Sequence, residues 1–267
     1  LQEEYIDNSA DRIYIVNQED FPNQPYNMDT DDHITLEIDE DIEIDEDIEI
    51  DILTIGEPSP RSIIWFACNQ GDETAEVITA RKLASQGYQF YFPDMLSAHF
   101  LSPTPSNIAR VPTAEISTVI QHILNTTKSE KVYLIGGARA AVPVLKGLSD
   151  KKLKTPGSKL NGALLITPRI NSKTPEPGAE PIYISEAGLS THPILVLEGE
   201  RTPNRWGLPH LVNILSKSGS IVQSGLIKGV RGFFYLRTEK TPEEDEMTRN
   251  LDQLIDSNIK KLENIKP

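Results

Sequence analysis

From residue 61 onward, short apolar runs alternate with longer amphipathic stretches. Each apolar run is bounded by Pro, Gly or polar residues, which is typical of strands buried on both faces. The stretches between them gather apolar residues on one helical face. This alternation predicts right-handed crossovers and a mostly parallel sheet flanked by helices. The expected strands are 63–68, 88–92, 132–135, 162–166 and 194–198, and the expected helices are 73–86, 113–125, 140–148, 208–218 and 241–263. Residues 12–17, 221–227 and 233–236 are also expected to be extended.

One of these strand–helix units resembles a catalytic motif. The apolar run 132–135 enters a turn of small residues at 136–140 and leaves into an apolar helix. This is the strand–turn–helix context of the nucleophile elbow, Gly-x-Ser-x-Gly. Ala138 stands where the motif has Ser, and Ala140 stands where it has the last Gly. A methyl group cannot attack a carbonyl carbon, so the segment predicts an enzyme's backbone turn without its nucleophile.

The N-terminal part holds an acidic repeat. Residues 38–43 read Ile-Asp-Glu-Asp-Ile-Glu, and residues 44–49 repeat them. Every odd position from 37 to 51 is acidic, and most even positions are Ile or Leu, so the pattern predicts strands with one apolar and one charged face. One strand across 34–52 would run for about 60 Å, which is too long for a compact domain. Bends are therefore expected near 39–41 and 45–47.

This segment accounts for nearly all of the net charge. Residues 29–51 contain 13 Asp and Glu and no Lys or Arg, so setting them aside changes the net charge from −14 to −1. We expect a solvated acidic face that protects an edge strand from aggregation. The alternatives are a docking site for a protein partner and a Ca²⁺ site at Asp39, Asp41, Asp45 and Asp47. No cofactor is expected, and the negative charge argues against nucleic acid as a partner.

From about residue 61 the chain resembles the α/β-hydrolase superfamily, in particular dienelactone-hydrolase-like proteins and small esterases. The matching segments are Ile-Ile-Trp-Phe-Ala-Cys-Asn-Gln-Gly (63–71), Gly-Tyr-Gln-Phe-Tyr-Phe-Pro-Asp (87–94), Gly-Gly-Ala-Arg-Ala-Ala (136–141), Pro-Ile-Leu-Val-Leu-Glu-Gly-Glu-Arg-Thr (193–202) and Gly-Val-Arg-Gly-Phe-Phe (229–234). The resemblance implies an α/β fold with a mostly parallel central sheet flanked by helices. We expect residues 61–267 to form this domain and residues 1–60 to be an acidic antiparallel β extension on the same sheet.

The resemblance also assigns the catalytic positions. The nucleophile falls on Ala138, the acid on Thr202 and the histidine on Arg231. Ala has no nucleophilic oxygen, Thr carries no charge, and Arg cannot accept a proton near pH 7. Glu200 is an alternative acid, two residues from Thr202. We therefore expect a catalytically degenerate member that is not an enzyme and acts by binding a protein partner or a small anionic ligand.

The competing hypothesis is an esterase-like hydrolase with displaced catalytic residues in loops around Ser97, His99 or Ser185. For the binding hypothesis, the backbone N–H of the residue after Ala138 would point into the cleft at a helix N-terminus, which favours anions. The candidate ligand-binding residues are Asn69, Gln70, Arg139 and Arg231. Alternatively, Arg231 pairs with an acid such as Glu198 or Glu200 and fills the pocket.

Location is constrained only weakly. No apolar run approaches the roughly 20 residues that span a bilayer. The chain begins at Leu1 rather than Met, and we expect a mature exported protein, periplasmic or secreted, with a cytoplasmic protein as the alternative. Cys68 is the single cysteine, so an intrachain disulfide is excluded, and a small buried hydrophobic residue is the expected role.

Overall fold

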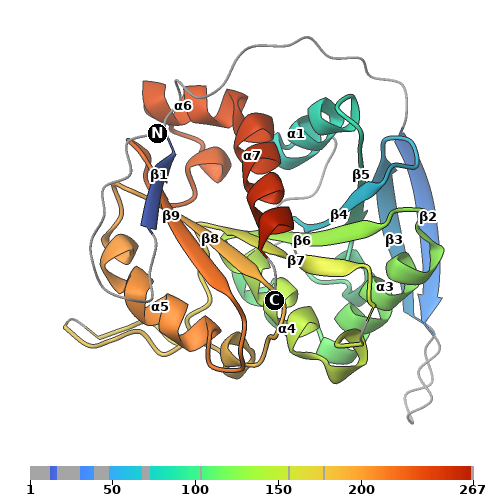
Figure 1. The fold of residues 1–267 in the computed structure, drawn as a ribbon, viewed down its shortest axis with the longest axis horizontal. Helices are drawn as coiled ribbons and strands as arrows, with labels where there is room; N and C mark the ends of the chain where they lie inside the picture. Colours follow the sequence, from blue (N-terminus) through green and yellow to red (C-terminus); the bar gives the residue numbers. More distant parts are fainter. Residues whose placement is uncertain are drawn as a thin grey trace.

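The computed structural model describes residues 13–16, 31–38, 48–67, 73–102, 104–155, 157–176 and 178–265. The strands are β1 (Ile13–Val16), β2 (Asp31–Ile38), β3 (Ile48–Ile55), β4 (Arg61–Phe66), β5 (Tyr88–Pro93), β6 (Lys131–Gly137), β7 (Leu160–Ile166), β8 (Ile194–Gly199) and β9 (Val222–Ile227). They form one sheet in the order β1-β9-β8-β7-β6-β4-β5-β3-β2 (Figure 1). Every pairing from β1 to β5 is parallel, whereas β3 pairs antiparallel with both β5 and β2.

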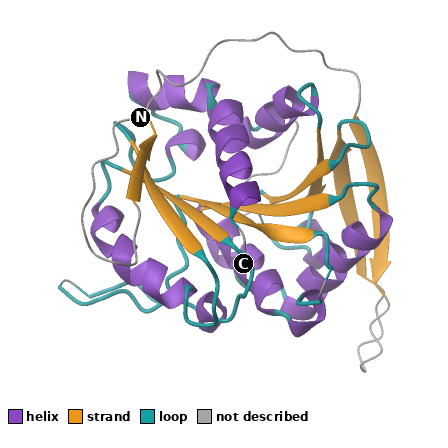
Figure 2. Ribbon diagram, viewed as in Figure 1, coloured by secondary structure: helices purple, strands orange, loops and turns teal. Residues whose placement is uncertain are grey.

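Helices cover both faces of the sheet (Figure 2). One face carries α1 (Ala75–Ala84), α6 (Pro242–Arg249) and α7 (Leu251–Asn264), and the other carries α3 (Thr113–Thr126), α4 (Ala141–Ser149) and α5 (Leu208–Leu215). A short helix, α2 (Pro105–Ile108), lies in the connection before α3. Across the described residues, no helix combines the length and apolarity that crossing a membrane requires.

The apolar strands supply two cores. In β4, Ile64 and Phe66 pack toward α3 and α4, whereas Ile63 and Trp65 pack toward α1 and α7. A strand that is buried on both faces cannot alternate apolar with polar residues, which explains the continuous apolar runs. The predicted α/β fold with its mostly parallel sheet is therefore confirmed.

The predicted antiparallel extension is confirmed for β2 and β3. In β3, Ile50 and Ile52 are buried while Glu49 and Asp51 are exposed, as the alternation predicts. In the edge strand β2, Ile34 is partly exposed. The expected bends and the four candidate Ca²⁺ ligands fall within 39–47, outside the described residues. The first strand departs from the expectation, because β1 joins the opposite edge of the sheet, parallel to β9.

Two sequence-based expectations near the C-terminus are wrong. Residues 233–236 are not extended, because Phe233 has a positive φ of 61° and a 3₁₀ turn, η7 (Phe234–Leu236), follows it. Phe234 and Tyr235 are buried, and this turn is therefore as rich in apolar residues as a buried strand. Hydropathy alone cannot distinguish such a turn from a strand. The single helix expected at 241–263 is two helices, interrupted at Asn250. The interruption leaves no mark in the apolar pattern, since Met247 and Leu251 on either side are both buried.

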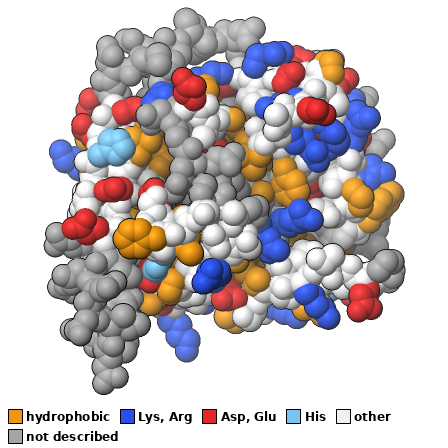
Figure 3. Space-filling view, turned by 180° about the vertical axis from the view of Figure 1, so that it is seen from behind, with side chains coloured by type: hydrophobic (Ala, Val, Ile, Leu, Met, Phe, Trp, Pro, Cys, Tyr) orange, Lys and Arg blue, Asp and Glu red, His pale blue; other side chains and the backbone are white. Residues whose placement is uncertain are grey.

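The described surface carries charges of both signs. Figure 3 shows Lys and Arg side chains interspersed with Asp and Glu over one face of the molecule. Charged side chains of the described residues also form ion pairs, such as that of 2.6 Å between Arg61 Nε and Glu263 Oε1 and that of 2.6 Å between Arg81 Nη2 and Asp31 Oδ2. The second pair links the edge strand β2 to α1.

Candidate functional site

The elbow expected from the sequence lies where β6 ends. The strand runs into a 3₁₀ turn, η3 (Ala138–Ala140), and then into α4. Ala138 has a φ of 48°, which is uncommon for a residue with a side chain. Its carbonyl oxygen accepts a hydrogen bond of 2.8 Å from the backbone N–H of Arg169. The backbone therefore has the strand–turn–helix shape that exposes a nucleophile, with a methyl group in the nucleophile's place.

Close packing fixes the small residues of this turn. A Cβ atom on Gly136 would lie 2.4 Å from the carbonyl oxygen of Ala140. A Cβ atom on Gly137 would lie 1.7 Å from Oη of Tyr235, a buried residue of η7. Neither glycine can be replaced without moving backbone or an aromatic ring. The turn is thus tightly packed, and Tyr235 from the loop after β9 lies against it.

The neighbouring strands bring further residues to the same edge. Gly137 pairs with Ile166, and Ile166 pairs with Leu197. Ala138 and Thr167 follow β6 and β7 directly, and Glu198 is the next residue along β8, so all three come to the carboxyl edge of the sheet. Ligand sites of open parallel sheets lie at this carboxyl edge. Thr167, with a φ of 45°, accepts a hydrogen bond of 3.1 Å at Oγ1 from the Phe233 N–H.

Glu198 is the functional candidate that sequence reasoning missed. Its side chain is 2 % exposed, and its Oε1 accepts a hydrogen bond of 2.9 Å from the Gly199 N–H. Burial raises the pKa of Glu198 to about 7, although the Gly199 bond acts in the opposite direction. A carboxyl group with a pKa near neutrality can exchange a proton with a substrate at physiological pH. The sequence signal was an acid at the end of an otherwise apolar strand.

The two other triad positions have structural roles. Thr202 Oγ1 accepts a hydrogen bond of 3.4 Å from the Asn204 N–H and caps a 3₁₀ turn, η6 (Pro203–Gly207). Arg231 Nε and Nη2 donate to Glu244 Oε1 and Oε2 at 2.7 and 2.6 Å. Thr202 and Glu198 do lie near each other, because a Cβ on Gly232 would lie 3.5 Å from Thr202 Oγ1 and 3.9 Å from Glu198 Oε1.

The expected partners of Arg231 are corrected accordingly. Arg231 forms its ion pair with Glu244 of α6, through Nε and Nη2, rather than with Glu198 or Glu200. Glu200 Oε2 instead accepts a hydrogen bond of 2.9 Å from the Gly229 N–H, which steadies the turn after β9. The guanidinium of Arg231 is thus held by the carboxylate of Glu244.

Two other arginines lie at the elbow. Arg139 Nη1 donates to the carbonyl oxygen of Asn171 at 2.9 Å, and burial together with the nearby charge of Arg169 lowers the pKa of Arg139. The Arg169 guanidinium lies 5.4 Å from the ring centroid of Phe233. Within the part of the chain that is described, neither guanidinium pairs with a carboxylate. The candidates Asn69 and Gln70 lie outside the described residues.

The residues of the displaced-site hypothesis are dispersed. His99 lies in η2 (Ser97–His99), where its Nε2 pairs with Glu115 Oε2, and the Ser97 N–H donates to Asp94 Oδ1 at 2.9 Å. Ser185 begins η5 (Ser185–Gly188) on another loop.

Ser185 Oγ donates to Glu186 Oε2 at 2.8 Å rather than to a histidine. In the described ranges, no group of three His, Cys, Asp or Glu side chains could hold a metal ion.

Solved structures with the same fold are hydrolases and esterases by name. A putative dienelactone hydrolase from Klebsiella pneumoniae aligns with a TM-score of 0.57 at 14% identity, covering 84% of this chain and 98% of the other. An esterase from Pyrobaculum calidifontis gives a TM-score of 0.58 at 13% identity, covering 88% and 87%. Thermogutta terrifontis esterase 2, phosphoramylated by tabun, gives 0.55 at 14% identity, covering 82% and 92%. No protein-family model and no curated protein matches the sequence.

These likenesses confirm the α/β-hydrolase fold that the sequence motifs predicted. The expectation that the chain is not an enzyme is contradicted, because the proteins that share this fold are named hydrolases and esterases. The protein partner and the periplasmic or secreted location stay predictions from the sequence.

Proposed function

We propose that this protein is an esterase-like hydrolase whose catalytic groups are displaced from the three usual triad positions. The observation that carries the proposal is the buried carboxyl group of Glu198, with a pKa of about 7, at the carboxyl edge of the sheet. In the register of the strands it is one residue beyond Leu197, as Ala138 is one residue beyond Gly137. Glu198 and the elbow therefore face the same edge, two strands apart.

In the proposed reaction, water replaces the missing serine as the nucleophile. The ionised Glu198 carboxylate takes a proton from water while the water oxygen bonds to the ester carbonyl carbon. The backbone N–H after Ala138, at the start of the helical turn, stabilises the negative oxygen of the tetrahedral intermediate. The ester C–O bond then breaks, and protonated Glu198 returns the proton to the leaving alcohol. Atoms balance, since one water is consumed for each ester cleaved.

The proposal includes a movement of the loop after β7. Glu198 is nearly inaccessible. Burial, followed by the charge of Glu198, raises the pKa of Tyr183 in this loop to about 12, so the two side chains interact. In this proposal a substrate reaches the Glu198 carboxylate only when the Tyr183 side chain moves away. Such loop openings are common gating steps in enzymes.

The arginines at the elbow support an ester that carries a negative charge. Arg139 and Arg169 lie at the elbow, and neither guanidinium has a carboxylate partner among the described side chains. Guanidinium groups recognise carboxylates and phosphates through directed N–H bonds. We therefore propose small anionic esters as the preferred substrates.

The test compares p-nitrophenyl acetate with mono-p-nitrophenyl succinate, whose second carboxylate supplies the negative charge. We expect kcat/KM to rise through an apparent pKa near 7, and Glu198→Gln to lower it by about 100-fold. Glu176→Gln, which removes an exposed carboxylate from the loop after β7, should leave kcat/KM unchanged. Arg169→Met should raise KM for the succinate ester alone. Wild-type rates in Glu198→Gln would overturn the mechanism.

A fluorophosphonate probe separates this mechanism from one with a displaced serine. The Thermogutta esterase is phosphoramylated by tabun, whereas a water nucleophile leaves no covalent adduct. We expect no labelling of this protein. Labelling that disappears in Ser185→Ala or Ser97→Ala would assign the chemistry to that serine instead of Glu198.

A further inference from the structure

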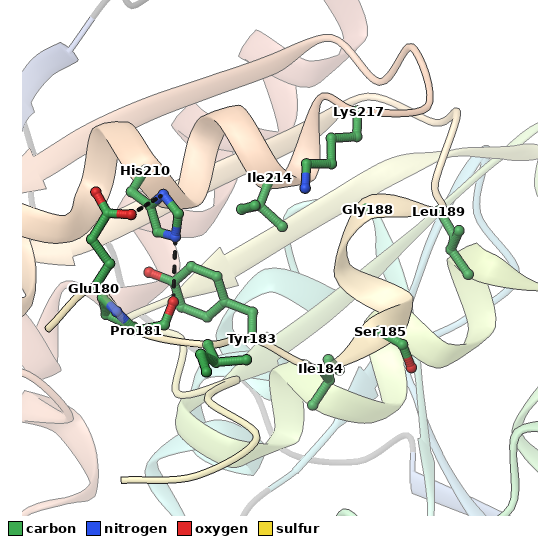
Figure 4. A pocket seen from close by; sticks show the side chains of 11 residues that line it. Glu180, Pro181, Tyr183, Ile184, Ser185, Gly188, Leu189, His210, Ile214 and Lys217 are labelled. Carbon is green, nitrogen blue, oxygen red and sulfur yellow. Dashed lines mark hydrogen bonds and ion pairs between the residues drawn. The ribbon is translucent and has the colours of Figure 1, made fainter. Parts of the chain in front are cut away.

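A concave site lies away from the elbow, between residues 180–189 and α5 (Figure 4). Its volume is about 480 Å³, within the range of about 300–1,000 Å³ typical of small-molecule sites. We call it the α5 pocket. Six of its lining residues carry the argument: Glu180, Ile182, Leu189, His210, Ile214 and Lys217.

A short paired segment separates the α5 pocket from the elbow. Asn171 and Tyr183 form an antiparallel bridge, flanked by a hydrogen bond of 2.8 Å from the Ser172 N–H to the Ile182 carbonyl oxygen. The Asn171 side of this pair faces the elbow, because its carbonyl oxygen accepts from Arg139. The Tyr183 side lines the pocket. A ligand in the α5 pocket therefore lies apart from the elbow at Ala138.

The middle of the α5 pocket is apolar. Leu189 is 46 % exposed and Ile182 is 54 % exposed, and both line the concavity together with Ile214. Exposed aliphatic side chains in a hollow are covered favourably by a hydrocarbon, because the ligand and the walls both lose contact with water.

The two ends of the pocket differ in charge. At one end Glu180 Oε2 lies 3.6 Å from His210 Nδ1, and His210 Nε2 lies 3.3 Å from the Pro181 carbonyl oxygen. At the other end the Lys217 side chain runs along Gly188, since a Cβ there would lie 3.4 Å from Lys217 Cδ. Figure 4 shows its ammonium on the Ile214 side. Among the described residues, no carboxylate pairs with Lys217.

We propose that the α5 pocket binds a monocarboxylate with a hydrocarbon body. The carboxylate pairs with the Lys217 ammonium, and the hydrocarbon lies along Ile214 and Leu189. Glu180 at the far end disfavours a second negative charge there, which sets both the direction of the ligand and its preference for a single anion. An ion pair at the rim of an apolar hollow is stronger than one on an open surface, because less water screens it.

The probe for this proposal is sodium octanoate, titrated into the full chain by calorimetry. We expect saturable binding that weakens by about tenfold in Lys217→Met, which removes the charge and keeps an unbranched side chain. The matched control is Lys228→Met, at an exposed lysine outside the pocket, and it should bind as the wild type does. Equal affinity in wild type and Lys217→Met would overturn the assigned carboxylate contact.

Two ligand series test the remaining parts of the proposal. Affinity should rise by about threefold for each methylene added from butanoate to octanoate. Octanol and octylammonium should bind more weakly than octanoate, and equal affinity for either would overturn the anion preference. Repeating the titration in Glu198→Gln separates this site from the proposed chemistry, since octanoate binding should persist there whether or not the protein hydrolyses esters.

Discussion

At the scale of single residues, the burial of Glu198 has a cost in stability beside the chemical role proposed above. Its carboxyl group is buried at the end of β8, and the pKa is raised from the ordinary 4.5 to about 7. Below pH 4.5 both the folded and the unfolded protein hold this proton. Between pH 4.5 and 7 the unfolded chain releases it first, so the free energy of unfolding falls as pH rises. Above about pH 7 the loss is complete.

Glu198→Gln should remove this pH dependence. We expect the variant to gain about 2–3 kcal/mol of stability relative to the wild type when the pH rises from 5 to 8, at about 1.4 kcal/mol per pKa unit. Urea unfolding at the two pH values measures the difference. Thr79→Val, a buried substitution in α1 without an ionisable group, is the control and should shift stability equally at both. A difference between Glu198→Gln and wild type that does not change with pH would contradict the raised pKa.

Ala138 should be one of the few alanines that a glycine improves. A side chain at a φ of 48° costs about 1–2 kcal/mol, and the greater freedom of glycine in the unfolded chain offsets part of that gain. We expect Ala138→Gly to stabilise the protein by about 0.5 kcal/mol. Ala141→Gly, at an ordinary φ of −64° in the same connection, should destabilise it by about 1 kcal/mol. Thermal unfolding of both variants checks the contrast, and equal losses would show that the turn is unstrained.

The sequence predicted residues at this scale unevenly. The elbow at Ala138 could be predicted because small residues between a strand and a helix are a local pattern. Glu198 could not, because its raised pKa comes from burial, which the folded structure creates and the local pattern does not contain. The same limit applies to Arg231, whose partner Glu244 lies in a helix that the motif does not include.

At the scale of elements, α6 is held by a cap and an ion pair that share one carboxylate. Thr241 Oγ1 accepts from the Glu244 N–H at 3.3 Å, and Glu244 Oε2 accepts from the Thr241 N–H at 3.0 Å. The buried Glu244 Oε1 also accepts hydrogen bonds from the backbone N–H and from Nε of Arg231. The Arg231 bonds lower the pKa of Glu244 to about 2 despite its burial.

Glu244→Gln should therefore destabilise the protein by about 2 kcal/mol, because the amide keeps an acceptor for Thr241 but loses the charged bonds to Arg231. Thr241→Ala should cost about 1 kcal/mol, as expected for a cap. The ion-pair contribution is present above about pH 4.5 and is lost as pH falls toward 2, opposite in sign to the effect of Glu198. Urea unfolding at pH 7 and pH 3 measures both variants. If Glu244→Gln destabilised the protein equally at pH 7 and pH 3, the lowered pKa of Glu244 would be contradicted.

Elements were predicted from periodicity where one pattern covered one element. The strands and helices from 61 to 227 follow this rule, because each apolar run ends at Gly, Pro or a polar residue. The predictions were wrong where two helices share one continuous apolar pattern, as at Asn250. They were also wrong where a buried turn has as many apolar residues as a strand, as at Phe233.

At the scale of the whole molecule, the segment before residue 60 borders the sheet on both sides. β1 pairs with β9 at one edge, and β2 and β3 extend the other (Figure 1). The parity of Ile and acidic residues predicts strands but contains no information about which edge they join. That choice depends on pairings with β9 and β5, far along the chain, so the sequence alone could not predict it.

The edge strand β2 should open independently of the sheet centre. In the described part of the sheet β2 pairs only with β3, and its side chains from Asp31 to Thr35 are exposed, whereas β6 and β7 are buried on both faces. Hydrogen exchange by mass spectrometry should show β2 amides exchanging at least about 100-fold faster than those of β6. Glu244→Gln should accelerate exchange in β6 by the factor that its loss of stability predicts and leave β2 unchanged. If β2 and β6 accelerate together, β2 belongs to the same cooperative unit, and a boundary near residue 60 would have no energetic meaning.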